Sequence, residues 1–598
     1  MAKQPQPEQW GVTSPFSQEK PSAQDMKLDQ SLTAELKRNN VFAPQNEIDL
    51  REELCNTLER LLKEMVQTVG KKRGLPQSIL DDAGGKLFPY GSYKLGVHSP
   101  GSDIDALMAA PKHVTKDDFF EHMPDLLRGS CTPAELGKLV AVPSINVPII
   151  KLEMKGVEID LIFVSLQVQS VPSTTELTDD SLLRGLTETD VRSANGPRVA
   201  ARLLELVPQV KTFRVTLRAI KLWAGRRGIY GNTYGYPGGV AYAILVARVC
   251  QLYPYAAAPM IVRKFFWVMK NWGWPKPLFI QKKVDSSLGF REFDPTISRA
   301  DAAHLMPILT PAYPRNNSAH TVGPSTKAII MRELARGSEI AEDIYAGKKQ
   351  WKDLFAKHAF FTESYKHYIF VTSTGKTKDA AAEFAGRVQS RVRWLVKGIE
   401  ESNANSVELV QPYFKAVDRE HEVHNQEDFD KVLDGSLDFQ VKAAKTTDID
   451  KMLQEKVEEA AQISDEGAAG EAVTTNGDTS TSTAVAWPQK MYTSTIYLGI
   501  ALRRNVGGLA LDISAPVRNF QTDVQAWDKY DDALHKMTIK HARNFNLPDD
   551  LFGEGETKPS APKKKSKAPN NTAANNKRSL AEAGLDVCHD HFEKKFCS

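Results

Sequence analysis

The sequence predicts a multidomain α+β protein, and three observations lead to this expectation. The chain has 598 residues, which at roughly 100–200 residues per domain is enough for about three or four domains. Short β-like runs and glycine-rich turns fill residues 85–170, whereas helical periodicity dominates residues 209–355. After residue 360, strand-like and helix-like segments alternate. We therefore expect a mixed sheet domain, a helical middle domain and a C-terminal α+β domain.

Hydrophobic periodicity identifies the individual elements in chain order. Residues 1–30 are polar and proline-rich, and we expect them to lie over a surface. A helix is expected at 51–65, and strands at 103–111, 147–155 and 157–164. Further helices are expected at 213–228, 238–253, 325–345, 381–401 and 521–530, and further strands at 367–375 and 494–502.

Composition limits the class of protein and its surroundings. The 37 glycines and 33 prolines are close to ordinary usage, which excludes a collagen-like or wholly disordered chain. Five cysteines without a CxxC pair argue against a disulfide scaffold. The N-terminus lacks the apolar segment of a secretory signal. The longest apolar stretch, 238–250, is shorter than the roughly 20 residues of a bilayer span. We expect a soluble intracellular protein that does not contact membranes.

The net charge of +3 is unevenly distributed. Residues 558–578 hold seven basic and no acidic residues, so the remaining chain carries 70 basic and 74 acidic residues. Nucleic-acid affinity of the folded part would therefore depend on local patches. Residues 562–567 have the pattern of a nuclear localisation signal, although a basic tail could instead strengthen RNA binding non-specifically. The polar stretch 455–486 is expected to be a long mobile loop.

Three aspartates form the most informative constellation. Asp103 and Asp105 project from the same face of a strand because side chains alternate. Paired carboxylates are suitable ligands for divalent cations. Asp160 lies within an apolar strand, where its charge is costly unless something positive binds it. A metal would meet that cost. The alternative is that Asp103 and Asp105 mark an exposed strand end and Asp160 pairs with a lysine.

Gly91 and Ser92 precede the first aspartate pair by about ten residues. Glycine lets the backbone approach a phosphate closely, and backbone amides with the serine hydroxyl can hold the phosphate oxygens. This turn, the spacer and the three aspartates together resemble the nucleotidyltransferase superfamily that includes DNA polymerase β. Residues 90–115 more narrowly resemble the nuclear poly(A) polymerases of eukaryotes, especially fungal ones.

The likeness to poly(A) polymerases covers about residues 10–420 and continues more weakly to about 530. It includes 147–163, 182–199, 213–254 and 306–314. Two positions depart from the family pattern: Tyr90 stands in place of the usual Phe, and Lys94 in place of the usual Arg. The resemblance implies a nucleotidyltransferase (polymerase β-like) domain at 1–208, a helical middle domain at 209–358, an RNA-recognition-like α+β domain at 359–540 and a disordered basic tail at 541–598.

The resemblance also implies roles for individual residues. Lys221, on a basic helix stripe with Arg214 and Arg218, would reach the triphosphate, although such a stripe could simply be solvated. Tyr230 would contact phosphate or sugar, and Asn232 would meet the adenine. Lys151 and Asn195 would contact RNA. The nucleotide-binding set is then Tyr90, Gly91, Ser92, Ser102, Asp103, Asp105, Asp160, Lys221, Tyr230, Asn232, Gly239 and Val240.

The reaction implied is template-independent addition of AMP from ATP to the 3′-OH of pre-mRNA, with release of pyrophosphate. Two Mg²⁺ ions, or Mn²⁺, would be held by Asp103, Asp105 and Asp160. The resemblance further implies a nuclear enzyme, a monomer within the cleavage and polyadenylation complex. Alternatives are a uridylyl- or CCA-adding transferase and a non-catalytic RNA-binding scaffold. In the C-terminal domain the candidate RNA contacts are Arg387, Arg391, Arg393, Lys397, Arg503 and Arg504.

Overall fold

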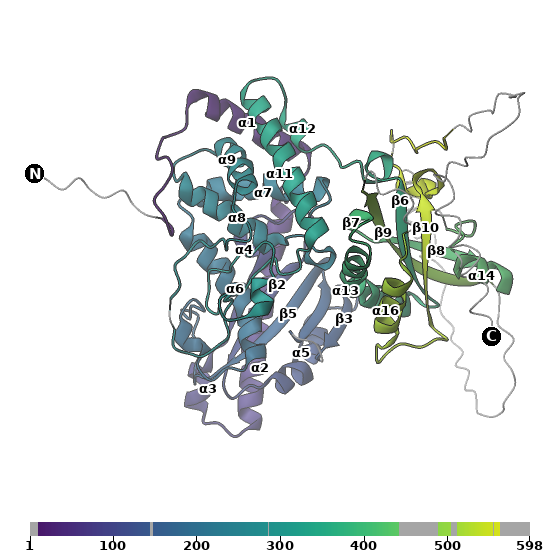
Figure 1. Ribbon diagram of the computed structural model, residues 1–598. Coiled ribbons are helices and arrows are strands. Elements are labelled where there is room, and N and C mark those ends of the chain that lie inside the picture. Colours follow the sequence, from purple (N-terminus) through teal and green to yellow (C-terminus); the bar gives the residue numbers. More distant parts are fainter. Residues whose placement is uncertain are drawn as a thin grey trace, which may run out of the picture. The chain divides into compact units, whose positions relative to one another are not determined.

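The computed structural model describes residues 10–143, 147–284, 286–433, 435–441, 488–503, 511–553 and 555–562 (Figure 1). It divides into two compact units, Met1–His358 and Ala359–Ser598. The predicted loop at 455–486, Arg504 and the basic run from Lys563 onward lie outside the described residues. Among the helices that are described, none has the length and apolar character needed to cross a membrane.

A five-stranded sheet organises the N-terminal part of the first unit, in the order β1-β2-β5-β4-β3. Strands β2 and β5 run parallel, and the other neighbours are antiparallel. The three strands predicted here are confirmed as β2, β4 and β5, whereas β1 and β3 were not predicted. The bounds are β1 Lys86–Pro89, β2 Ile104–Pro111, β3 Leu136–Val142, β4 Ile149–Met154 and β5 Val157–Leu166.

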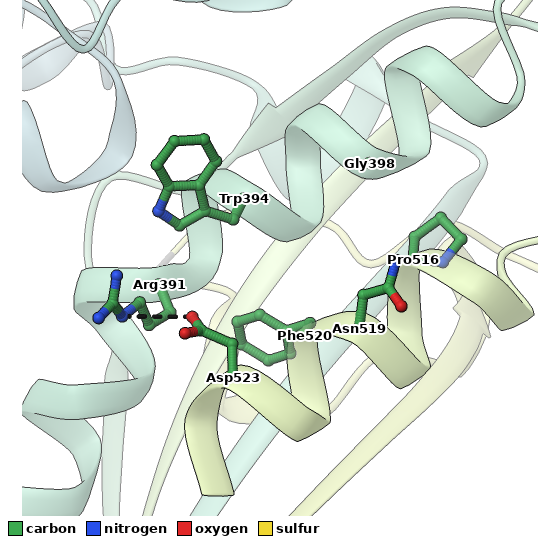
Figure 2. A pocket seen from close by; sticks show the side chains of 7 residues that line it. All are labelled: Arg391, Trp394, Gly398, Pro516, Asn519, Phe520 and Asp523. Carbon is green, nitrogen blue, oxygen red and sulfur yellow. Dashed lines mark ion pairs between the residues drawn. The ribbon is translucent and has the colours of Figure 1, made fainter. Parts of the chain in front are cut away.

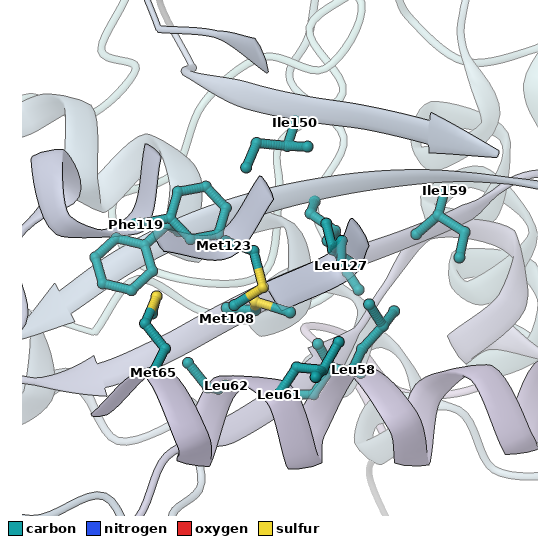
Figure 3. Close-up of a cluster of buried hydrophobic side chains, with 14 of the residues drawn as sticks. Leu58, Leu61, Leu62, Met65, Met108, Phe119, Met123, Leu127, Ile150 and Ile159 are labelled. Atoms are coloured by element: carbon teal, nitrogen blue, oxygen red, sulfur yellow. The ribbon is translucent and has the colours of Figure 1, made fainter. Parts of the chain in front are cut away.

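Helices cover both faces of this sheet. On one face, α2 (Gln45–Lys72) and α5 (Lys116–Ser130) pack their apolar stripes against alternate residues of the strands, as Figure 3 shows. On the other face, α6 (Glu188–Leu206) packs against a second cluster. Ile104 and Ile159 belong to the first cluster. Because side chains alternate, the neighbouring Asp105 and Asp160 are directed toward the α6 face.

The rest of the first unit is helical, as predicted. The expected helices at 213–228, 238–253 and 325–345 are α7 (Val210–Arg226), α8 (Gly239–Leu252) and α11 (Pro324–Tyr345). Residues expected only to lie over a surface form a regular helix, α1, because Leu32 and Leu36 are buried on one side of it. The remaining helices are α1 Ala23–Arg38, α3 Gln77–Ala83, α4 Gly91–Leu95, η1 Asp180–Leu183, η2 Asn232–Tyr234, α9 Ala258–Lys270, α10 Arg299–Ala302 and α12 Trp351–Leu354.

The second unit is the predicted α+β domain. Its sheet has the order β10-β6-β9-β7, and β8 also pairs with β9. The strands are β6 His367–Gly375, β7 Val407–Pro412, β8 Val417–Val423, β9 Gln489–Leu502 and β10 His535–Arg543. The helices are η3 Phe360–Ser364, α13 Lys378–Ser402, α14 Gln426–Leu433, α16 Ser514–Gln525, η4 Asn544–Asn546 and η5 Asp549–Leu551.

The last part of this unit differs from the prediction of a tail that begins at residue 541. Strand β10 continues to Arg543, and Leu547 and Leu551 are buried. Asp550 forms an ion pair with the buried Arg419, with Nε and Oδ2 2.7 Å apart. Residues 541–551 therefore belong to the folded unit. The sequence did not predict this because these residues are mostly polar. One ion pair and two buried leucines hold them in place, and they have no periodic apolar face.

Candidate active site

The strand register brings two of the three predicted aspartates into one row. Asp105 on β2 lies opposite Asp160 on the parallel strand β5. Lys151 on β4 lies opposite Asp160 on the other side. Asp103 differs from the prediction because it precedes β2, whose pairing with β5 begins at Ile104. Asp105 thus comes from β2, Asp160 from the neighbouring strand β5, and Asp103 from the loop that leads into β2.

Gly91 lies directly against this row. The predicted turn is a single helical turn, α4, which follows β1. Gly91 has φ +61°, and a Cβ atom there would lie 2.2 Å from Oδ2 of Asp105. The backbone N–H of Tyr90 donates to the carbonyl oxygen of Asp105 at 2.9 Å. Only glycine allows the backbone to pass this close to the carboxylate.

The electrostatics of the site are dominated by negative charge. Burial, together with the charges of Asp103 and Asp160, raises the pKa of Asp105 to about 6, although Lys151 acts in the opposite direction. Burial and the same three carboxylates raise the pKa of the Tyr90 phenol. Repulsion among the carboxylates is what a bound cation would relieve.

The donor set is suitable for a hard divalent cation because it consists of carboxylate oxygens. In the described part of the chain, however, no three or more His, Cys, Asp or Glu side chains converge closely enough to hold an ion as they stand. Both oxygens of Asp160 accept hydrogen bonds from Nζ of Lys151, at 2.8 and 3.1 Å. The lysine pairing considered from the sequence is therefore present, and a cation would have to share Asp160 with it.

The basic stripe of α7 is not a solvated surface. Nζ of Lys221 donates to the carbonyl oxygen of Val97 at 3.3 Å, and Nε of Arg214 donates to that of Leu95 at 2.9 Å. Arg218 lies over the ring of Phe42. Burial lowers the pKa of Lys221, as does Arg218, whereas Asp103 raises it. Lys221 therefore lies within electrostatic reach of the first aspartate.

The residues predicted for the nucleotide form one neighbourhood at the start of α8. The Tyr230 ring stacks on Tyr242, and a Cβ atom at Gly239 would lie 2.7 Å from the Tyr230 hydroxyl. Oδ1 of Asn232 is buried without a hydrogen-bond partner. Val240 is 37% exposed in the first turn of α8. A buried unpaired acceptor and an exposed apolar side chain are both features suited to binding a planar polar base.

Two more predicted residues, Asn195 and Ser102, adjoin residues of the aspartate side of the site. Oδ1 of Asn195 on α6 is also buried without a partner. The adjacent Gly196 packs so tightly on Tyr90 that a Cβ atom would lie 2.8 Å from its ring. Oγ of Ser102 accepts a hydrogen bond from the N–H of Ser99 at 3.0 Å, which closes the turn before Asp103.

Sequence reasoning missed Arg51 on α2. Its guanidinium donates to the carbonyl oxygens of Ser102 and Asp103. Arg51 occupies a position of the apolar helix stripe that continues through Leu54 and Leu58. A charged residue on such a stripe is the signal that could have identified it. His98, which is also buried, has both ring nitrogens without partners, and burial and nearby cations lower its pKa.

The predicted basic residues of the C-terminal unit are mostly engaged. Arg387 and Arg391 form ion pairs with Asp523, and Arg503 donates to the carbonyl oxygens of Ala404 and Val407. Arg393 and Lys397 lie over the ring of Trp394, each 5.5 Å from its centroid. Arg391, Trp394 and Asp523 also line a pocket of about 250 Å³ between α13 and α16 (Figure 2).

Comparisons with protein families match almost the whole chain. Residues 11–207 match the poly(A) polymerase nucleotidyltransferase domain, residues 212–357 the poly(A) polymerase central domain, and residues 359–561 the poly(A) polymerase predicted RNA binding domain.

Curated relatives are similar over most of their lengths. Poly(A) polymerase pla1 of Schizosaccharomyces pombe is 41% identical over 563 residues, 94% of this chain and 96% of that protein. Poly(A) polymerase PAPa of Candida albicans is 36% identical over 556 residues, 92% of this chain and 94% of that protein. Among solved structures, the RNA terminal uridylyl transferase Cid1 covers 56% of this chain with 99% of its own, at 15% identity. The TM-score between the two structures is 0.37.

Proposed function

This chain belongs to the poly(A) polymerase family, and we propose that its Asp103–Asp105–Asp160 site carries the reaction of that family. The chain is a polynucleotide adenylyltransferase, which adds AMP from ATP to the 3′ end of RNA without a template in mRNA processing. The observation that supports the site most directly is the register that places Asp105 beside Asp160, with Gly91 against the Asp105 carboxylate.

The reaction depends on a divalent metal, as the family implies. We propose two Mg²⁺ ions, replaceable by Mn²⁺, with Asp103, Asp105 and Asp160 as ligands. When bound, such cations lower the pKa of the attacking 3′-hydroxyl and neutralise charge on the triphosphate. The raised pKa of Asp105 supports this assignment because a cation relieves the repulsion among the three carboxylates.

The chain's own side chains would bind and orient the nucleotide. Gly91 and Ser92 of α4 would approach the phosphates, and Lys221 would supply a point charge to the triphosphate. Tyr230 would donate to phosphate or sugar, and Tyr90 would pack beside the carboxylates. The buried Oδ1 of Asn232 would accept a hydrogen bond from the adenine amino group, while Val240 and Gly239 line the base. Ser102 would keep the turn before Asp103 closed.

Lys151 and Asn195 would contact the RNA end. Lys151 is exposed and already adjoins Asp160, and the Oδ1 of Asn195 is buried without a partner. In the C-terminal unit, Arg393 remains a candidate, and so does Lys397, whose ion pair with Glu401 is 3.7 Å long and joins two exposed side chains. Arg387 and Arg391 are weaker candidates, since releasing them would break ion pairs.

We propose that residues 1–208 form the catalytic domain, 209–358 the middle domain and 359–561 the RNA-binding domain. The spans of the three family matches support these divisions. The basic run that follows would act as a nuclear import signal. The enzyme would work as a monomer within the cleavage and polyadenylation complex, bound to its other subunits.

Primer extension tests the assignment. A short RNA is incubated with Mg²⁺ and each nucleoside triphosphate in turn, using wild type, Asp103→Ala and the exposed control Asp117→Ala. We expect extension with ATP alone, retained in the control and lost in Asp103→Ala. Extension with UTP or CTP would indicate another terminal transferase, and no extension by wild type would indicate a scaffold. Activity that survives in Asp103→Ala would refute the carboxylate assignment.

A further inference from the structure

The backbone that carries Asp103 is held by side chains rather than by the sheet. Residues 101–103 precede the first paired residue of β2, Ile104. Arg51 of α2 donates from one terminal nitrogen to the carbonyl oxygen of Asp103 at 3.3 Å, and from the other to that of Ser102. One turn earlier on α2, Glu47 accepts from the N–H of Gly101 at 3.3 Å. Three consecutive residues of the loop are thus bound to two side chains of one helix.

Burying the charge of Arg51 at this position is energetically unfavourable. It is 1% exposed, its Nε has no hydrogen-bond partner, and its nearest carboxylate, that of Glu47, is 3.9 Å away. An apolar side chain of similar volume would continue the stripe of α2 without burying a charge. The guanidinium provides instead a planar pair of donors that can hold two neighbouring carbonyl groups at once.

The position of Asp103 affects several other groups in the site. Its charge acts on Asp105, on Lys221 and on Tyr230. Asp105 is fixed by the β2–β5 ladder, so the relative placement of the two carboxylates depends on how the loop is held. In metal sites, groups that orient the ligands typically contribute 10–100-fold to affinity or activity.

We propose that Arg51, together with Glu47, is a positioning residue that holds the Gly101–Asp103 backbone so that the Asp103 carboxylate stays beside Asp105. The proposal rests on the proposed function of Asp103 as a cation ligand. In this role Arg51 acts through the two carbonyl groups to which it donates.

The test compares Arg51→Gln and Arg51→Lys with Arg248→Gln in the full-length chain. Arg248 is a matched control because it is 3% exposed and its guanidinium donates to Thr13, away from this loop. Mn²⁺ affinity is measured by electron paramagnetic resonance in the presence of ATP, together with kcat, the KM for RNA and the melting temperature. We expect Arg51→Gln to lose about 10–100-fold in Mn²⁺ affinity and kcat, with the KM for RNA unchanged.

We expect Arg51→Lys to retain part of the Mn²⁺ affinity and kcat that Arg51→Gln loses, because lysine keeps the charge and can reach one carbonyl group. If Arg51→Gln is unfolded at the assay temperature, Glu47→Ala is measured in its place, with the same losses expected in smaller degree. The control should lose stability without losing Mn²⁺ affinity. Equal loss of Mn²⁺ affinity in Arg248→Gln would overturn the proposal, because the effect would then follow from destabilisation alone.

A double-mutant cycle with Asp103→Asn completes the test. If Arg51 acts through Asp103, adding Arg51→Gln to Asp103→Asn causes no further loss of Mn²⁺ affinity, whereas additive losses would overturn the proposal. If Arg51→Gln binds Mn²⁺ and extends RNA like wild type while Asp103→Asn is inactive, the positioning role alone is overturned. Normal Mn²⁺ binding and extension by Asp103→Asn would overturn the proposed function, and the positioning role with it.

Discussion

Lys151 and Asp160 face each other across β4 and β5, and the lysine ammonium donates to both oxygens of the aspartate carboxylate, at 2.8 and 3.1 Å. Asp105 lies on the other side of Asp160 in the same row. A positive charge therefore stands at the end of two adjacent carboxylates. It opposes the burial and repulsion that raise the pKa of Asp105.

Removing this charge should make the site more sensitive to acid. In Lys151→Met, the pKa of Asp105 rises further because the charge of Lys151, which lowers it, is lost. A protonated Asp105 cannot bind a cation, so the acid limb of kcat/KM for ATP should move to higher pH. Profiles between about pH 5 and pH 8 test this. Lys155→Met is the control because Lys155 pairs with Glu53 instead. An unchanged limb would contradict the prediction.

Asp105 should lower the stability of the metal-free protein at neutral pH. Folding raises the pKa of Asp105 from 3.8 to about 6, so the folded state favours the protonated carboxyl. The stability that this protonated carboxyl contributes is fully present below pH 3.8 and is lost as the pH rises through about 6. Asp105→Asn should therefore be more stable than wild type by about 1–3 kcal/mol near pH 7.5, after allowance for partial exposure. The gain should shrink toward about pH 4.5.

Thermal melting in EDTA at both pH values measures this difference. Saturating Mn²⁺ should reverse it, because only wild type gains stability from a cation on Asp105. A less stable Asp105→Asn at neutral pH without metal would show that Asp105 is held by favourable contacts rather than strained by repulsion.

The sequence was sufficient to predict the elements that depend on periodic burial. Strands β2, β4 and β5 and helices α7, α8 and α11 follow apolar patterns, so their positions could be predicted closely. Strand β3 could not, because most of its residues are only partly buried and its pattern is mixed. Helix α1 was missed although Leu32 and Leu36 stand at the helical spacing of i and i+4, because most residues around them are polar.

In the candidate site, residue types and spacing suggested the aspartates, but not how each is held. Nothing in the spacing of Asp103 and Asp105 indicates that one precedes the strand and the other belongs to it. The pairing of Lys151 with Asp160 depends on the hairpin register, and the contact of Arg51 depends on how α2 packs on the sheet. Such contacts are tertiary and leave no local pattern in the sequence.

Gly91 should be essential for the position of Asp105. An alanine there would place Cβ 2.2 Å from Oδ2 of Asp105, and φ is +61°. Gly74→Ala is the matched control, since Gly74 has φ +70° and nothing within 4 Å of its Cβ position. Both variants should lose about 1–2 kcal/mol through the left-handed backbone. Gly91→Ala alone should lose about 100-fold in kcat, because the carboxylate must move. Comparable activity in the two variants would refute the close-contact argument.

Asn232 should determine the preference for ATP over UTP. Its Oδ1 is buried without a partner, so a base with an amino group can satisfy it, whereas a base without one leaves it unpaired. In Asn232→Ala, kcat/KM for ATP should fall about 10–100-fold while that for UTP changes little, because UTP never gained that bond. Thr233→Ala, the exposed neighbour in η2, should leave both values unchanged. Asn232 also packs against Gly238, where a Cβ atom would lie 3.0 Å from Nδ2. An equal fall for ATP and UTP would therefore mean that Asn232 supports the turn rather than reads the base.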